Sequence, residues 1–160
     1  MKKSFIPLFA MLLTLCCCPY SLIANDLTTQ KPSDLEIVGT YRVTAQNLDT
    51  NGLKAFQNRQ PQLIFNVDGS CVVSDFPVWE ENTSSFKINA WLSFDGKWAI
   101  VNDGSVRRGG KTYDVWGIRC NSNIETMGTG EFTGTKPPYD VVFIYGDPDS
   151  DNAMTFSKMP

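Results

Sequence analysis

The sequence contains no histidine among its 160 residues. This absence excludes Ser-His-Asp and Cys-His catalytic arrangements, and it removes the histidine ligands of the usual zinc sites. Cysteine is scarce as well, because three of the five cysteines fall in the run Cys16–Cys18 near the N-terminus. Only Cys71 and Cys120 lie beyond that run. Nucleophilic and metal-dependent chemistry therefore has few residues available.

Without histidine, an enzyme would depend on a pair of carboxylates. Glu125 and Glu131 have the same parity, but on one strand they would lie roughly 20 Å apart at about 3.3 Å per residue. The two carboxylates of a glycosidase lie about 5 to 9.5 Å apart. Glu80 and Glu81 are adjacent and point in opposite directions on an extended chain. We therefore expect no catalytic residues and no cofactor, and a cross-strand pair of acids is the enzymatic alternative.

Positive charge is also in short supply. Lysine and arginine together number 14, against 17 aspartates and glutamates, so the formal net charge is −3. An acidic protein is repelled by a phosphate backbone. The composition therefore indicates that nucleic acid is not a partner.

Long hydrophobic runs are absent except at the N-terminus, where Phe5 to Cys18 is apolar and follows Lys2 and Lys3. The run is too short to span a bilayer but has the length of a signal-peptide core. We predict that residues 1–24 are a signal peptide cleaved after Ala24. The mature chain would then lack a transmembrane span and be periplasmic or secreted. A lipoprotein anchored at Cys16 is the alternative.

The two remaining cysteines are predicted to form a disulfide, since an exported protein folds in an oxidising compartment. A bond between Cys71 and Cys120 would close a loop of about 50 residues, worth roughly 4 kcal/mol in the chain-entropy model. Two separate buried thiols are the alternative.

Turn residues and alternating apolar residues indicate β-structure along most of the chain. Residues 25–34 are polar and are expected to form a flexible lead, followed by one domain over residues 35–160. Alternation begins between Leu35 and Ala45, and the run from Tyr139 to Tyr145 is almost wholly apolar, as in a central strand. The final strand is expected from Ala153 to Lys158. Residues 46–61 are interpreted as a polar connection.

Two Asp-Gly pairs predict hairpins. At Asp68-Gly69, a three-residue loop closing on a left-handed glycine pairs odd residues with odd residues. This register places the following four side chains on one face: Leu63, Phe65, Cys71 and Val73. By the same reasoning, Asp95-Gly96 is expected to join strands 86–94 and 97–101, with Trp98 and Ile100 beside Leu92 and Ala90.

The pattern amounts to about eight to ten short strands and no convincing amphipathic helix. Connections of hairpin length make neighbours in sequence pair antiparallel, and closure of the sheet removes its exposed edges. We therefore predict an all-β fold with a single antiparallel barrel, up-and-down or lipocalin-like. A β-sandwich is the alternative.

The acidic run near the C-terminus raises the question of a metal site. Asp147, Asp149 and Asp151 alternate as the first ligands of a calcium loop do, but Asn152 stands where such a loop needs Gly and Lys158 stands where it needs Glu. The same stretch has turn chemistry between two apolar runs. We favour a turn and keep a metal site on these three aspartates as the alternative.

The C-terminal stretch PPYDVVFIYGDPDS, followed by MTFSK, resembles the signature of a group of small exported bacterial β-rich proteins of unassigned function. The stretches IVGTYRV, FNVDGSCVVSDFPVW and GKWAI resemble the same group, so the likeness covers roughly residues 38–158. The sequence departs from that pattern at Asp151, where the group has Gly. Gly-x-aromatic triplets at Gly39–Tyr41 and Gly96–Trp98 bear a weaker likeness to lipocalins. Both resemblances imply fold and compartment only.

Aromatic and basic side chains are the candidates for contact with a ligand or partner. An aromatic ring can stack on a ligand or anchor a protein partner, and a basic turn can dock an acidic surface. The candidates are Trp79, Trp91, Trp98, Tyr113, Trp116, Tyr139, Arg107 and Arg108. The alternative is that the aromatic residues are core and the arginines are a solvated turn.

The sequence predicts a non-catalytic binding protein of the periplasm or extracellular space. One hypothesis is a small apolar or amphipathic ligand held in the barrel lumen by strands 86–94 and 139–145. The other is a protein-interaction module, such as an inhibitor or immunity protein for an exported enzyme.

Overall fold

The computed structural model describes residues 26–47, 56, 58–79, 88–145 and 153–160. The predicted signal peptide, Phe86 and the three aspartates Asp147, Asp149 and Asp151 lie outside these residues, as does the side chain of Trp79. No helix of the described part is long and apolar enough to cross a membrane.

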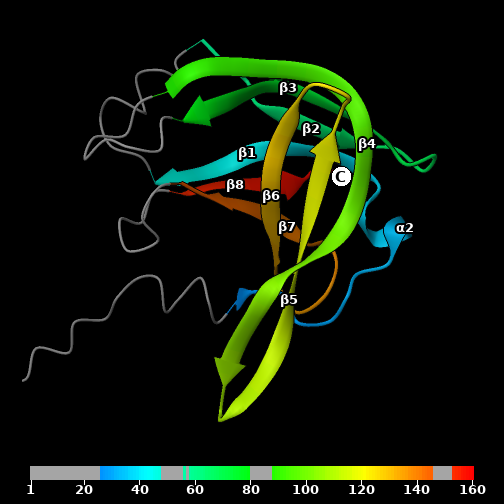
Figure 1. The fold of residues 1–160 in the computed structure, drawn as a ribbon, viewed down its shortest axis with the longest axis vertical. Helices are drawn as coiled ribbons and strands as arrows, with labels where there is room; N and C mark the ends of the chain where they lie inside the picture. The colour runs from blue at the N-terminus through cyan, green and yellow to red at the C-terminus, as the bar shows by residue number, and fades with distance from the viewer. Residues whose placement is uncertain (1–25, 48–55, 57, 80–87, 146–152) are drawn as a thin grey trace, which may run out of the picture.

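The described chain is one closed antiparallel barrel of eight strands (Figure 1). Each strand pairs with its neighbours in sequence, and β1 pairs with β8 to close the sheet. The predicted barrel is therefore confirmed over the sandwich. The strands are β1 (Gly39–Asn47), β2 (Gln62–Phe65), β3 (Ser70–Trp79), β4 (Ile88–Arg108), β5 (Lys111–Asn121), β6 (Thr126–Thr133), β7 (Asp140–Ile144) and β8 (Ala153–Lys158).

A short helix, α2 (Asp34–Ile37), precedes β1 where the alternation predicted a strand from Leu35. That part of the prediction is wrong. The carboxylate of Glu36 accepts hydrogen bonds from the backbone N–H of Ser33 at 2.7 Å and from its hydroxyl at 2.9 Å. Ser and Glu three residues apart are a helix-start signal, and here it prevails over the alternation.

The first Asp-Gly pair forms the predicted hairpin. Leu63 lies opposite Val73 and Phe65 lies opposite Cys71, and all four side chains are buried. Gly69 has φ +80°, and its N–H donates to the carbonyl of Asn66 at 3.0 Å. The three-residue loop with a left-handed glycine and its odd-with-odd register are thus confirmed.

The second Asp-Gly pair is not a turn, and the predicted hairpin at residues 95–96 is wrong. β4 runs unbroken through both residues, with Asp95 opposite Val72 and Gly96 opposite Cys71. A β carbon on Gly96 would overlap the carbonyl oxygen of Asn121 and lie 2.7 Å from its carbonyl carbon. The glycine is therefore required by the close approach of β5, where β4 passes from pairing with β3 to pairing with β5.

Aromatic side chains fill the barrel interior. Phe76, Phe143 and Phe156 contact one another, with ring centroids 4.8 Å apart for the first two and 5.6 Å apart for the last two. β7 is buried along its middle, as predicted for a central strand. One continuous hydrophobic cluster also includes the following buried residues: Tyr41, Leu63, Phe65, Ile118, Met127, Phe132, Val141 and Met154.

The predicted disulfide is confirmed. Cys71 of β3 and Cys120 of β5 are bonded, with their Cα atoms 6.2 Å apart and a sequence separation of 49. Their strand partners on β4 are Gly96 and Trp98. The bond therefore ties β3 to β5 across the segment where β4 changes partners.

Residues 26–28 lie within the sheet rather than apart from it, although residues 25–34 were expected to form a flexible lead. The N–H of Thr28 donates to Phe132 at 2.8 Å, and its carbonyl accepts the N–H of Trp116 at 3.3 Å. The N–H of Gly134 donates to Asp26 at 2.8 Å. This N-terminal segment therefore bridges β5 and β6 beyond Gly117 and Glu131, where their direct pairing ends.

Candidate functional site

The predicted contact residues do not gather at one place. Trp98 donates its indole N–H to the carbonyl of Asn66 at 2.9 Å and so fastens β4 to the β2–β3 turn. Tyr139 is buried, with its ring 6.2 Å from that of Phe132. Trp116 is half-buried beneath the ammonium of Lys31, which lies 5.2 Å from the ring centroid. These three aromatic residues are thus part of the packing.

The remaining predicted residues lie at the two ends of β4. Trp91 is near its start, while Arg107 and Arg108 are at its end, and Tyr113 follows on β5. Trp79 ends β3 opposite Ile88. The candidates therefore divide between a groove beside Trp91 and a ribbon that leaves the barrel.

We call the first feature the β1 groove. It has a volume of about 300 Å³ and lies between β1 and the segment that leads into β2. Its described lining residues include two arginines and no acid. They are Arg42, Val43, Gln46, Phe56, Arg59, Gln60 and Pro61.

Arg59 is held in place in the β1 groove from two sides. Its Nη1 lies 2.8 Å from Oδ1 of Asp75, and its guanidinium lies 5.3 Å from the ring centroid of Trp91. Asp75 is in the left-handed region at φ 50° and donates its N–H to the hydroxyl of Ser93 at 3.0 Å. The Arg59 side chain stays 46% exposed. A positioned cation therefore faces the groove.

Phe56 anchors the segment that carries Arg59. Its ring packs edge-on against Trp91 at 5.2 Å, its side chain is only 9% exposed, and its carbonyl accepts the N–H of Arg59 at 3.0 Å. The sequence interpretation treated residues 46–61 as a polar connection and missed both residues. The signal was present in an isolated aromatic residue within an otherwise polar stretch.

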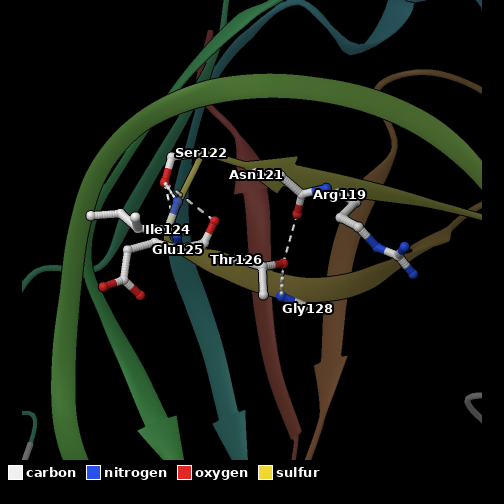
Figure 2. Close-up of a pocket in the computed structure, with 7 residues that line it drawn as sticks. All are labelled: Arg119, Asn121, Ser122, Ile124, Glu125, Thr126 and Gly128. Atoms are coloured by element: carbon white, nitrogen blue, oxygen red, sulfur yellow. Dashed lines mark hydrogen bonds between the residues drawn. The ribbon is translucent and has the colours of Figure 1, made fainter.

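A larger but more open depression lies on the β5–β6 hairpin (Figure 2). It measures about 540 Å³, and its polar groups bond to one another. Thr126 donates to Oδ1 of Asn121 at 2.6 Å, and the hydroxyl of Ser122 accepts the N–H of Glu125 at 2.9 Å. The Arg119 guanidinium turns away from this cluster and donates to Thr129 at 2.7 Å. Several of the polar groups that line this depression are thus already hydrogen-bonded within the chain.

The second feature is the β4–β5 arm, residues 102–115, which extends from the barrel as a two-stranded ribbon (Figure 1). Its turn is Gly109-Gly110, with φ of 54° and 79°. Tyr113 is 38% exposed opposite Val106, and Arg107 is exposed. Arg108 reaches back and donates to the carbonyl of Leu27 at 2.9 Å.

Glu131 is the described carboxylate with the most unfavourable surroundings. Burial raises its pKa above the usual range, and the negative charge of Asp103 raises it further. Its Oε2 is buried without a hydrogen-bond partner in the described structure. Gly117, directly opposite on β5, has no side chain that could hydrogen-bond to this carboxylate. Glu131 and Asp103 are thus two interacting carboxylates on different strands, and within the described residues they belong to no group of three or more acids that could hold a metal ion.

Replacing Glu131 by Gln is expected to stabilise the barrel at neutral pH by about 1 kcal/mol, the lower end of the cost of an unpaired buried polar group. A raised pKa means that folding favours the protonated acid. The stabilisation contributed by the protonated Glu131 is complete below pH 4.5, the ordinary pKa of a glutamate. It is lost as the pH rises through the raised pKa of the folded protein. Urea unfolding at several pH values measures this.

The stability advantage of Glu131→Gln should shrink as pH falls towards 4.5. Glu125→Gln, at the open β5–β6 depression, is the control and should leave stability unchanged at each pH. A Gln variant of Glu131 that is less stable than wild type at pH 7 would contradict the account.

Metal coordination gains no support from the described residues, among which no group of three or more Cys, Asp or Glu side chains is placed to hold an ion. The three aspartates of the sequence hypothesis fall outside that part. Comparison with known proteins found no matching family model, curated protein or solved structure.

Proposed function

We propose that the protein is an exported, non-catalytic interaction protein that contacts an acidic surface of a protein partner through the β4–β5 arm. The observation that carries the proposal is the form of this arm. Two paired strands continue beyond the barrel, exposed along much of their length, while the barrel itself is closed and filled. The resemblance to exported bacterial proteins supports the compartment.

The charge of the arm supports an acidic partner. Arg107, Arg108 and Lys111 surround the Gly109-Gly110 turn, whereas Asp103 and Asp114 lie nearer the barrel. Opposite charges speed encounter and fix orientation, and Tyr and Arg are frequent hot spots in interfaces. Beyond Trp98, β4 has a strand partner on one side only within the described chain, so its other edge is suited to pairing with an extended segment.

A ligand in the lumen has less support. The interior positions of the barrel are occupied by a continuous cluster of aromatic and aliphatic side chains. A barrel of about eight strands is narrow enough for side chains to fill it. We therefore place recognition on the outer surface of the protein.

Shortening the arm tests the proposal. Deleting two cross-strand pairs, Ser105 with Asp114 and Val106 with Tyr113, preserves the alternation and the Gly109-Gly110 turn. We expect the shortened protein to fold with nearly unchanged thermal stability but to lose its partner. The measurement is photo-crosslinking in the native host from a benzoylphenylalanine placed at Arg107, with mass spectrometry of the adduct.

Charge reversal is the second part of this test. Arg107→Glu keeps the length of the ribbon and is expected to weaken the partner complex by about tenfold or more, since a mismatched charge costs several kcal/mol. A photo-crosslinker at Arg119 of the β5–β6 hairpin is the control position and should not give the adduct. The same adducts from both positions, or an adduct unaffected by shortening, would contradict the proposal.

A further inference from the structure

We propose that the β1 groove is a binding site for a small amphipathic carboxylate, separate from the arm and independent of its function. The described lining of the groove includes Arg42 and Arg59 and no acid, although the protein as a whole is acidic. Asp75 pairs with Arg59 from outside this lining, so one arginine charge is left without an acid partner in the described structure, and this favours an anion.

The two arginines supply the recognition of the head group. Arg59 uses Nη1 for Asp75, and a guanidinium carries five N–H donors in a planar fork. Arg42 is exposed on β1 and has no ion-pair partner in the described structure. A carboxylate matches the fork geometry and can accept two parallel hydrogen bonds from it.

The position of Arg59 is set before any ligand arrives. Asp75, the ring of Trp91 and the buried Phe56 fix the segment and the guanidinium together. Less side-chain freedom is then lost on binding, and pre-organisation of this kind increases affinity. Arg42 lacks such support, so Arg59 should contribute more.

The other lining residues determine the rest of the ligand. Val43, Phe56 and Pro61 are apolar, and Gln46 and Gln60 each carry a polar amide. The volume of about 300 Å³ is at the lower limit for small-molecule pockets. An alkyl or aromatic body of modest size, bearing one carboxylate, fits this arrangement.

Titration of the purified protein with octanoate tests the site. We expect shifts in the ¹⁵N-resolved signals of the Arg59 Nε–H and the Trp91 indole N–H. Arg59→Gln should weaken octanoate binding by about tenfold or more, the loss expected for charge-assisted hydrogen bonds. Octanol and octylamine, which keep the alkyl chain without the anion, should bind more weakly by a similar factor.

Two further variants keep the test decisive. Arg42→Gln removes an exposed cation that has no ion-pair partner among the described residues, so it should fold normally and still weaken binding by a smaller factor than Arg59→Gln. Arg119→Gln, an exposed arginine at the β5–β6 depression, should leave octanoate affinity unchanged. The proposal is overturned if octanol binds as tightly as octanoate, if Arg119→Gln matches Arg59→Gln, or if millimolar octanoate shifts neither signal.

Discussion

Replacing Cys71 and Cys120 together by Ala is expected to lower the free energy of unfolding by about 4 kcal/mol, the chain-entropy value for a loop of this length. The bond closes a 49-residue separation and links β3 to β5 across β4. Total stabilities of small domains are about 5 to 15 kcal/mol, so the loss is a large share. Urea unfolding of the oxidised wild type and the double variant gives the difference.

Reduced wild-type protein is the matched control for the double variant. Both cysteines are fully buried, and alanine leaves no unpaired hydroxyl in their place. Reduction should therefore reproduce most of the loss seen in the variant. Equal unfolding midpoints for oxidised protein and the double variant would show that the linkage adds nothing to stability.

Replacing Gly96 by Val is expected to cost about 3 kcal/mol, the upper range for overpacking. The new side chain would meet backbone rather than a flexible side chain, since the carbonyl group of Asn121 occupies the space. Either β5 or β4 must then move at the segment where β4 changes partners. Chemical unfolding measures the loss, and slower closure of the Cys71–Cys120 bond should accompany it.

Lys97→Val is the matched control for Gly96→Val. It introduces the same side chain one position along β4, where the native residue is exposed. Exposed substitutions usually change stability by less than about 0.5 kcal/mol. A turn at residues 95–96 would tolerate both substitutions similarly, so equal losses would contradict the continuous strand.

The two Asp-Gly pairs show which parts of this fold a local sequence pattern can predict. At residues 68–69 the dipeptide has a turn of its own, with Ser70 donating both its N–H and its hydroxyl to the Asp68 carboxylate at 2.8 and 2.6 Å. At residues 95–96 the glycine is instead required by the close approach of the Asn121 carbonyl group, which is distant in sequence. The barrel was predictable because alternation and pairing parity are local properties, and the disulfide because only two cysteines lie beyond the N-terminal run. The unbroken course of β4 through Gly96 instead depends on a long-range contact.

The β1 groove was not predictable for a similar reason. Arg59 gains its position from Asp75 on β3 and Trp91 on β4, which the closed sheet brings together. Trp91 was among the predicted contact residues, but its partner Arg59 was not. Asp75 has its left-handed conformation at a register shift in β3 between Val73 and Phe76. No sequence pattern predicts that shift.

The bonding of residues 26–28 has a practical consequence for recombinant forms of the protein. A fragment starting at the first alternating stretch would leave the N–H groups of Trp116 and Gly134 and the carbonyl of Phe132 without their partners. Residues 26–28 therefore belong to the folded unit. Affinity tags fused ahead of Asp26 need a spacer, and truncation to residue 35 would remove part of the sheet.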